Sequence, residues 1–352
     1  MRDLERYVAE AQESLYFSGA RIDEYLGAFL DEQRAACVAL GRSLAGAARH
    51  LYVVGSGGSY AAALTGKYIL DGALELPVDA VASYELPWRD PARLGADAIV
   101  VLASYSGETE DTVAALRHAA ERGARTIAIV GKPESTMARE AEFVISYDNG
   151  AIYEIPIVAL LLIAAGLAEG TAAAEKLEPV IAGLDVLPAV LRRTLDIEAT
   201  KAEGRARDLL HDQHLYVLSC GPLSPLAYKV AMSVVMENLR IGATYSDACE
   251  WRHGPAEALE RLRGTFVVLL GTDASRELTL RTVEVCEANG SRVMVYDAAD
   301  FGDVHPLLTP IVMNSHTQWL IVYSAILRGI TDLDERVFMG RQILAAGGAQ
   351  WP

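Results

Sequence analysis

An internal repeat is the feature that most constrains how this chain of 352 residues can fold. Residues 214–221 match residues 50–57 at an offset of 164 (214 − 50), and residues 265–269 match residues 98–102 at an offset of 167 (265 − 98). Each matching segment contains an apolar run of the kind that forms a buried strand. The repeat predicts two copies of one α/β unit, each with a parallel sheet flanked by helices on both faces.

The remaining elements are predicted from apolar periodicity. Short apolar runs predict strands at 50–54, 77–82, 98–103, 126–130 and 143–146, and longer segments predict helices at about 61–74 and 154–168. The segment between the two copies is helical by pattern, so we expect it to link them and to pack across both. The predicted organisation is an N-terminal helical arm (1–48), a first domain (49–170), a helical linker (171–211), a second domain (212–330) and a C-terminal tail (331–352).

The charge and the cysteines argue against several classes of protein. The net charge of −16 and the pI near 4.9 argue against a nucleic-acid partner, because phosphate-backbone binding depends on clustered Lys and Arg. The four cysteines form no C-x-x-C pair, so we expect reduced thiols, no metal and no cofactor. The N-terminus lacks the apolar core of a signal peptide, and the apolar run at 157–168 is too short to span a bilayer. A cytoplasmic protein without a membrane partner is expected.

A hydroxyl-rich loop, Ser104-Tyr105-Ser106-Gly107-Glu108-Thr109, follows the predicted strand at 98–103 and precedes a predicted helix. Its hydroxyl groups converge with the free N–H groups of a helix N-terminus, where the helix dipole favours negative charge. This loop is therefore a candidate anion-binding site. Ordinary helix capping would account for the same residue types.

The second copy of the unit separates these two interpretations. At an offset of 167, Ser104, Ser106 and Thr109 correspond to residues that lack hydroxyl groups, namely Gly271, Asp273 and Arg276. Capping alone gives no reason for one copy to hold every hydroxyl donor. We therefore expect only the first copy to bind an anion.

A glycine-rich turn, Gly55-Ser56-Gly57-Gly58-Ser59-Tyr60, follows the first predicted strand. In the dinucleotide-binding fingerprint G-x-G-x-x-G, the third glycine would stand where this chain has Tyr60. No acidic residue follows at the position expected to bind the ribose. The turn therefore gives little support to an NAD site.

The doubled unit and its two polar turns, residues 56–60 and 104–109, resemble the sugar isomerase (SIS) family of phosphosugar enzymes. The second half is similar to the fructosamine (fructoselysine) 6-phosphate deglycases and to the isomerase domain of glucosamine-6-phosphate synthase. The motifs that carry this likeness are residues 221–229, 236–237, 250–257 and 332–336. The resemblance implies an α/β fold of two tandem SIS-type subdomains over about residues 45–340.

The same resemblance implies roles for individual residues. Glu237 is implied as the base that transfers the proton, and His253 as the group that assists ring opening. In this family the histidine is often delivered across a dimer interface, so we expect a homodimer or a dimer of dimers with the active site at the interface. The residues implied in binding the anion on C6 of the sugar are Ser56, Gly57, Ser59, Ser104, Tyr105, Ser106 and Thr109.

The chemistry of the residues agrees with these roles. Aldose–ketose interconversion needs a base that moves a proton between C1 and C2 and a second group that transfers protons to and from the sugar oxygens. It also needs a group that binds the far end of the sugar. Glu237 follows the apolar run 230–236, so we expect its carboxylate to be buried. Burying a charged carboxylate costs free energy, which favours a functional role for this residue. His253 could equally be a plain structural histidine near a helix start.

The function predicted from the sequence is the isomerisation of an open-chain hexose with an anion at C6. The hydroxyl loop contains no cation, so a sulfonate, as in sulfoquinovose, could be accepted as readily as a phosphate. One alternative is a fructosamine 6-phosphate deglycase, and another is a sugar-sensing SIS module without turnover. Glucosamine-6-phosphate synthase has a glutamine-hydrolysing domain and a lysine near its C-terminus; this chain has a helical arm and Gly340-Arg341 instead. Glutamine-dependent synthesis is therefore not expected.

Overall fold

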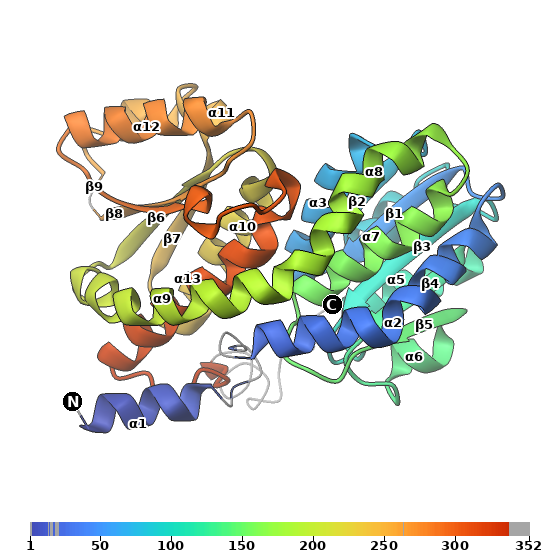
Figure 1. Ribbon diagram of the computed structural model, residues 1–352, viewed down its shortest axis with the longest axis horizontal. Helices are drawn as coiled ribbons and strands as arrows, with labels where there is room; N and C mark the ends of the chain where they lie inside the picture. The colour runs from blue at the N-terminus through green and yellow to red at the C-terminus, as the bar shows by residue number, and fades with distance from the viewer. Residues whose placement is uncertain (1, 13, 15–16, 18–20, 263, 338–352) are drawn as a thin grey trace.

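The computed structural model describes residues 2–12, 14, 17, 21–262 and 264–337. The prediction about Gly340 and Arg341, and most of the predicted tail, lie outside the described residues. The described chain forms two α/β lobes side by side (Figure 1).

The first lobe contains a five-stranded sheet in the order β2-β1-β3-β4-β5 with all pairs parallel. Side chains alternate between its two faces. Leu51 and Val53 of β1 pack in the cluster that includes α7, whereas Tyr52 and Val54 pack in the cluster that includes α5. Helices therefore cover both faces, as predicted. The strands are β1 (His50–Gly55), β2 (Val78–Ala82), β3 (Ala98–Ser104), β4 (Arg125–Val130) and β5 (Phe143–Ser146).

The second lobe repeats this plan with a four-stranded parallel sheet in the order β7-β6-β8-β9. β6 begins 164 residues after β1, and β8 begins 167 residues after β3, which confirms the repeat detected in the sequence. The strands are β6 (His214–Ser219), β7 (Gly242–Asp247), β8 (Thr265–Leu270) and β9 (Arg292–Asp297).

The helices that the sequence predicted in the first lobe, at about 61–74, directly after the loop at 104–109 and at 154–168, are present, whereas the short helices at 85–89 and 136–140 were not predicted. The helix after the first glycine turn begins at Gly58, three residues earlier than predicted, because Gly57 has a φ of +54° and turns the chain within one residue. The helices are α1 (Arg2–Ala11), α2 (Ile22–Leu44), α3 (Gly58–Asp71), α4 (Glu85–Arg89), α5 (Glu110–Glu121), α6 (Thr136–Glu140), α7 (Glu154–Ala168), α8 (Ala172–Gly183), η1 (Leu184–Val186) and α9 (Leu187–Asp208).

The helices of the second lobe include one π-helical segment, η3 (Val230–Leu239), which continues directly from α10. π-helical turns are rare and are often found at functional sites. The other helices are η2 (Gly221–Leu223), α10 (Ser224–Lys229), α11 (Ala248–Trp251), η4 (Pro255–Ala258), α12 (Arg276–Ala288), η5 (Ala298–Phe301), η6 (Pro306–Leu308) and α13 (Thr309–Leu327).

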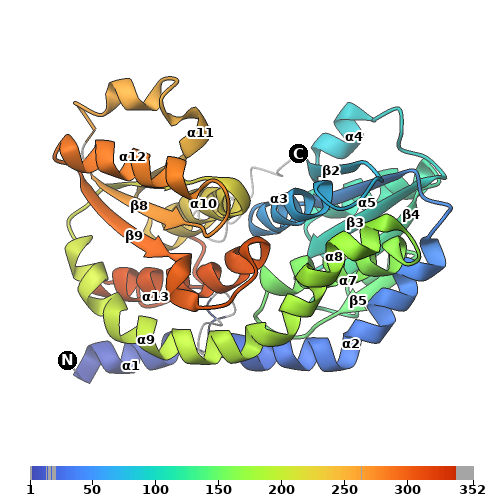
Figure 2. The same ribbon diagram turned by 45° about the horizontal axis from the view of Figure 1, so that its top comes forward.

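The two lobes share one hydrophobic core. α9 runs beneath both lobes and contacts α2 of the first and α13 of the second, as expected for the linking segment (Figure 2). α3 of the first lobe packs against α10 and η2 of the second. Buried side chains of all these helices belong to a single cluster, so the position of one lobe relative to the other is fixed by packing.

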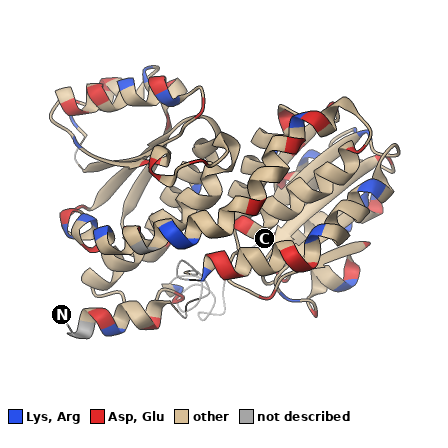
Figure 3. Ribbon diagram, in the orientation of Figure 1, with Lys and Arg blue, Asp and Glu red and all other residues tan. Residues whose placement is uncertain are grey.

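Charged residues of both signs are interspersed over the two lobes (Figure 3). This distribution agrees with the absence of a basic patch in the sequence. Among the described residues, no helix has the length and apolar character needed to cross a membrane.

Candidate active site

The hydroxyl loop lies where the sequence predicted it, between the end of β3 at Ser104 and the start of α5 at Glu110. Gly107 has a φ of +61°, and a Cβ atom there would come within 2.1 Å of Ser135 Oγ, so only glycine fits. Glu108 turns away from the loop and accepts a hydrogen bond of 2.7 Å from the Thr136 N–H. Because of that bond, the pKa of Glu108 is lowered, and its charged carboxylate is held at the start of α6.

The hydroxyl groups of this loop converge on one point. Ser104 Oγ lies 2.8 Å from Thr109 Oγ1 and 3.4 Å from Ser106 Oγ. Thr109 is the residue before α5, yet its side chain makes no capping hydrogen bond. Capping therefore does not explain this threonine, and its hydroxyl group remains directed to the other two at the helix N-terminus.

The glycine-rich turn after β1 forms the opposite wall of the same cavity. Ser56 and Ser59 line this cavity together with Ser104, Tyr105, Ser106 and Thr109. Ser56 Oγ donates a hydrogen bond to Asp111 of α5 and lies 2.9 Å from the hydroxyl oxygen of Ser83. Gly57 provides the turn but does not line the cavity, whereas Gly58 does. We call this space the anion cavity.

Two lysines line the anion cavity, which corrects the expectation of a site without a cation. Lys132 follows β4, the neighbour of β3, and its Nζ lies 5.4 Å from the centre of the Tyr105 ring. Lys229 reaches the cavity from the second lobe. The loop itself contains no cation. Packing brings two lysines to it, which stand 28 and 125 positions after Ser104 in the sequence (132 − 104 and 229 − 104). Lys132 is already paired with Asp148 at 2.8 Å, whereas Lys229 Nζ bonds to the neutral amide of Asn314, so Lys229 is the cation that favours a doubly charged anion such as a phosphate.

Lys229 is buried, with 7% of its surface exposed, and it has polar partners from both lobes. Its Nζ donates a 2.7 Å hydrogen bond to Asn314 Oδ1, and Asn314 Nδ2 donates one of 2.7 Å to Glu154 Oε1. Burial lowers the pKa of Lys229 to about 8, and burial raises the pKa of Glu154. The sequence contained Lys229 within a motif, but no local pattern indicated that its amine would enter the cavity.

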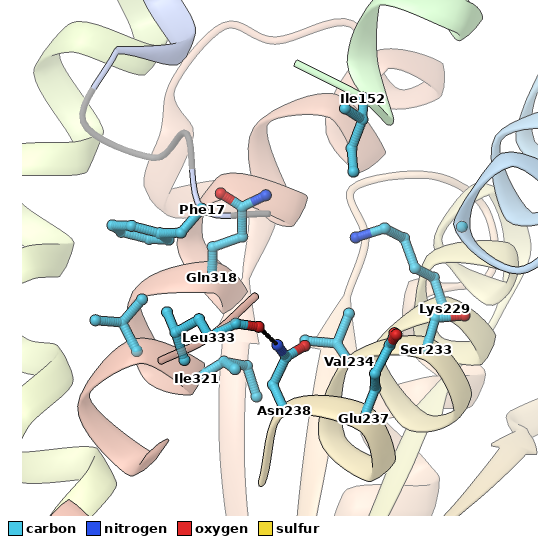
Figure 4. Close-up of a pocket in the computed structure, with 12 residues that line it drawn as sticks. Phe17, Ile152, Lys229, Ser233, Val234, Glu237, Asn238, Gln318, Ile321 and Leu333 are labelled. Atoms are coloured by element: carbon cyan, nitrogen blue, oxygen red, sulfur yellow. Dashed lines mark hydrogen bonds between the residues drawn. The ribbon is translucent and has the colours of Figure 1, made fainter. Parts of the chain in front are cut away.

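Glu237 lies on the π-helical segment η3, with Lys229 and Ser233 at every fourth residue on the same face (Figure 4). The expectation of a buried carboxylate was wrong: 38% of the Glu237 side chain is exposed. The helix turns this residue away from the core and into a cavity, where it forms an ion pair with Arg336. Arg336 belongs to the motif at 332–336 that the sequence singled out.

The cavity that contains Glu237 adjoins the anion cavity. Gly58, Ile152 and Lys229 line both, so the two spaces meet at the Lys229 amine, which points into the opening (Figure 4). We call the second space the base cavity. Apart from Glu237, Lys229 and Ser233, its walls are largely apolar, and they also contain the amide groups of Gln318 and Asn238. The apolar side chains are those of Phe17, Ile152, Val234, Ile321, Val322 and Leu333.

The structure does not bring His253 to this site. His253 follows α11, its side chain is exposed, and its ring accepts a hydrogen bond of 3.3 Å from Arg252 Nε. It lines neither the anion cavity nor the base cavity. The implied pair of Glu237 and His253 is therefore not assembled within one copy of the chain.

The corresponding loop of the second lobe is closed by its own ion pair. Arg276 donates hydrogen bonds of 2.7 Å to both carboxylate oxygens of Asp297 and one of 2.9 Å to Gly271 O. Its only cation is therefore occupied within the loop. That the first copy alone offers an anion site stays a prediction.

Comparisons with known proteins identify relatives of this chain. The SIS domain family matches residues 44–165. A fructosamine deglycase of Bacillus subtilis is 32% identical over 283 residues, which cover 75% of this chain and 84% of that protein. A fructoselysine 6-phosphate deglycase of Escherichia coli is 30% identical over 293 residues, covering 82% and 85%. The crystal structure of a candidate phosphosugar isomerase from Bacillus subtilis has a TM-score of 0.79 at 30% identity, covering 87% of this chain and 96% of that one.

Proposed function

This chain belongs to the SIS-domain family, and from that membership we propose that it is an enzyme that removes the amine from a fructosamine 6-phosphate. The observation that carries the proposal is the pair of adjoining cavities, one built for an anion and the other containing a carboxylate. An open-chain sugar with phosphate on C6 would place C1 and C2 near Glu237 while its phosphate contacts the hydroxyl loop and Lys229. Deglycase relatives at 32% and 30% identity support the same assignment.

The reaction requires only proton transfers and water. Glu237 would remove a proton from C1 of the ketosamine, which gives an enaminol, and a proton returned to C2 would give an imine at C1. Water adds to the imine carbon, the carbon–nitrogen bond breaks, and the products are glucose 6-phosphate and the free amine. The apolar part of the base cavity beyond Glu237 offers room for the amine substituent, which a plain hexose does not carry.

The second candidate is an aldose–ketose isomerase, the function first predicted from the sequence. It is favoured by the intact hydroxyl loop and by the likeness to a candidate phosphosugar isomerase. Both reactions begin with removal of a proton from the carbon next to a carbonyl group. They differ in whether an amine leaves.

A substrate panel distinguishes these functions. The protein is incubated in deuterated water with fructosamine 6-phosphates, with 6-phospho-hexoses and with 6-sulfo-hexoses, and the products are identified by mass spectrometry and NMR. A deglycase releases free amine and glucose 6-phosphate that carries deuterium at C2. Interconversion of a hexose pair without an amine would favour the isomerase instead, and binding without exchange or turnover would favour the sensing module.

The hydroxyl loop is expected to contribute binding rather than chemistry. Replacing Ser104 and Thr109 together with alanine should raise KM, because each charge-assisted hydrogen bond to the anion contributes roughly 1.5–3 kcal/mol. Steady-state kinetics on the best substrate of the panel measure this effect. Ser43, whose exposed hydroxyl group donates a hydrogen bond to Leu40 O on α2, provides the control variant Ser43→Ala. A KM that stays at the wild-type value in the double variant removes the loop from the site.

The exposed position of His253 leads us to propose that a second copy of the chain supplies it to each site. A C2 dimer is the commonest arrangement in which two copies exchange the same surface. Glu237→Gln and His253→Asn should each be inactive as homodimers. After co-expression, heterodimers have one intact site, so about one quarter of the wild-type sites should return. Sedimentation measures the assembly. A fully active monomer, or no recovery in verified heterodimers, contradicts this arrangement.

A further inference from the structure

A third cavity lies between the lobes, at the carboxyl ends of the strands of the second sheet. Its walls come from α3 and from the segments that follow β6, β7 and β8. Cys220 follows β6, Asp247 ends β7, and Cys249 lies in α11 directly after it. β6 and β7 are neighbouring parallel strands with Ser219 paired to Asp247, so the three side chains meet at one edge of the sheet.

These three residues, which we call the Cys-Asp cluster, bring their potential ligand atoms together. The two sulfur atoms are 2.8 Å apart, and a carboxylate oxygen of Asp247 completes a group in which all atoms lie within 4.8 Å of one another. Ligands about 2.0–2.3 Å from one metal ion are separated by up to about 4.6 Å, so the cluster has nearly the span of a coordination sphere. Cys220 is buried, and Cys249 is exposed at the cavity rim.

The carboxylate of the cluster is held in place by its neighbours. Asp247 Oδ1 accepts a 2.8 Å hydrogen bond from the Cys249 N–H, and Asp247 Oδ2 accepts one of 2.5 Å from Ser224 Oγ. Tyr245 OH donates a further bond of 3.4 Å to Oδ2. Hydrogen bonds of this kind orient carboxylate ligands at metal sites. Oδ1, which accepts one hydrogen bond, still has a lone pair that can face the sulfur atoms.

The acidic residues that line the third cavity favour the binding of a cation. Asp71, Asp247, Glu250 and Asp273 line it, and Lys67 is its one Lys or Arg among the described residues. Lys67 is already paired with Asp71 and donates a 2.7 Å hydrogen bond to a backbone carbonyl group. Asp273 Oδ2 is a buried atom with no hydrogen-bond partner among the described residues. Burying a carboxylate oxygen without a hydrogen-bond partner costs free energy, which a bound cation would offset. The negative charge of the cavity would repel an anionic sugar.

We propose that Cys220, Cys249 and Asp247 bind a zinc ion. Two thiolates with one carboxylate are the donors that zinc prefers, whereas magnesium and calcium prefer oxygen ligands alone. Water or Asp273 takes the fourth position from the cavity side. The sulfur atoms must separate from 2.8 Å to about 3.7 Å around a tetrahedral ion. Rotation of the exposed Cys249 side chain provides this movement without displacing the sheet.

Cobalt substitution tests the site directly. The full chain is purified with a phosphine reductant, stripped with a chelator and titrated with Co²⁺ under anaerobic conditions. We expect one ion per chain, a sulfur-to-cobalt charge-transfer band and its loss when Zn²⁺ is added. Zn²⁺ should also protect Cys220 and Cys249 from alkylation, which peptide mass spectrometry can measure residue by residue.

Variants localise the ion and control for folding. Cys220→Ser and Cys249→Ser should lose the charge-transfer band, whereas Cys286→Ala, a buried cysteine elsewhere in the same lobe, should keep it. Ser224→Ala removes the hydrogen bond to Asp247 and the one shared with Tyr245 OH, and it should weaken zinc binding by about 10–100-fold. This milder variant keeps the test valid if the cysteine variants fail to fold, which circular dichroism would reveal.

Several results would overturn the proposal. The first is no cobalt or zinc binding by the reduced wild-type protein. The second is an unchanged band or affinity in Cys220→Ser or Ser224→Ala. The third is a Cys220–Cys249 disulfide that forms in air and persists in the presence of Zn²⁺, because the pair would then act through sulfur oxidation and not as ligands.

Discussion

Replacing Glu237 with glutamine is expected to lower turnover by about 10²–10⁴-fold while KM changes little, the range for loss of a general base. Glutamine keeps the shape of the side chain and can still contact Arg336, but it cannot accept a proton. The same variant in deuterated water should fail to exchange the hydrogen on C1 or C2 of the sugar. Kinetics and NMR of the recovered sugar measure the two effects.

A matched control separates chemistry from a general change of charge. Glu203 forms an ion pair of 2.6 Å with Arg207 on the exposed surface of α9, so Glu203→Gln should retain wild-type turnover. Exchange at the wild-type rate in Glu237→Gln would mean that another group is the base. In that case both the deglycase and the isomerase would need a different catalytic centre.

Replacing Lys229 with methionine is expected to lower kcat/KM by about 10- to 150-fold. This is the effect of losing one charge-assisted bond of roughly 1.5–3 kcal/mol to the phosphate. Methionine keeps the length and apolar stem of the side chain, so it fills the buried space. Lys176, an exposed residue on α8, provides the matched control Lys176→Met, which should leave kcat/KM unchanged.

The pH dependence makes the Lys229 prediction specific. Burial lowers the pKa of Lys229 to about 8, so the amine is charged below that pH and loses its charge above it. The kcat/KM of the wild-type enzyme should therefore fall as pH rises through about 8, because kcat/KM reports the ionisation of the free enzyme. Lys229→Met should lose this step. If the step remains in the variant, the titrating group is a different one.

The position of the cation also bears on the choice of substrate. The hydroxyl loop alone binds by neutral donors, which suit a sulfonate as well as a phosphate. Lys229 adds positive charge at the same cavity, whereas the charge of Lys132 is offset by its ion pair with Asp148. A phosphate with two negative charges gains more from the Lys229 charge than a sulfonate with one. The 6-phospho substrates of the panel are therefore expected to have the lower KM.

The sequence by itself determined the doubled α/β plan, the five strands of the first copy, the strands β6 and β8 of the second and the hydroxyl loop on the first copy. These features depend on residues close together in the chain: apolar runs for strands, turn residues after them and hydroxyl groups before a helix. The offsets of 164 and 167 residues recur in the starts of β6 and β8 for the same reason. Local signals also predicted α7 at Glu154–Ala168 with its observed bounds.

Only the tertiary structure decided which distant side chains meet. Lys132 and Lys229 reach the anion cavity because β4 lies beside β3 and because α10 packs against α3. Glu237 lies on the exposed side of η3 and not in the core. The sequence could not show this, because an apolar run does not reveal which face of the helix borders a cavity. Cys220 and Cys249, 29 positions apart, become neighbours because β6 and β7 are adjacent parallel strands. Strand order and helix packing arise from the burial of the whole core, and a motif of a few residues cannot encode them.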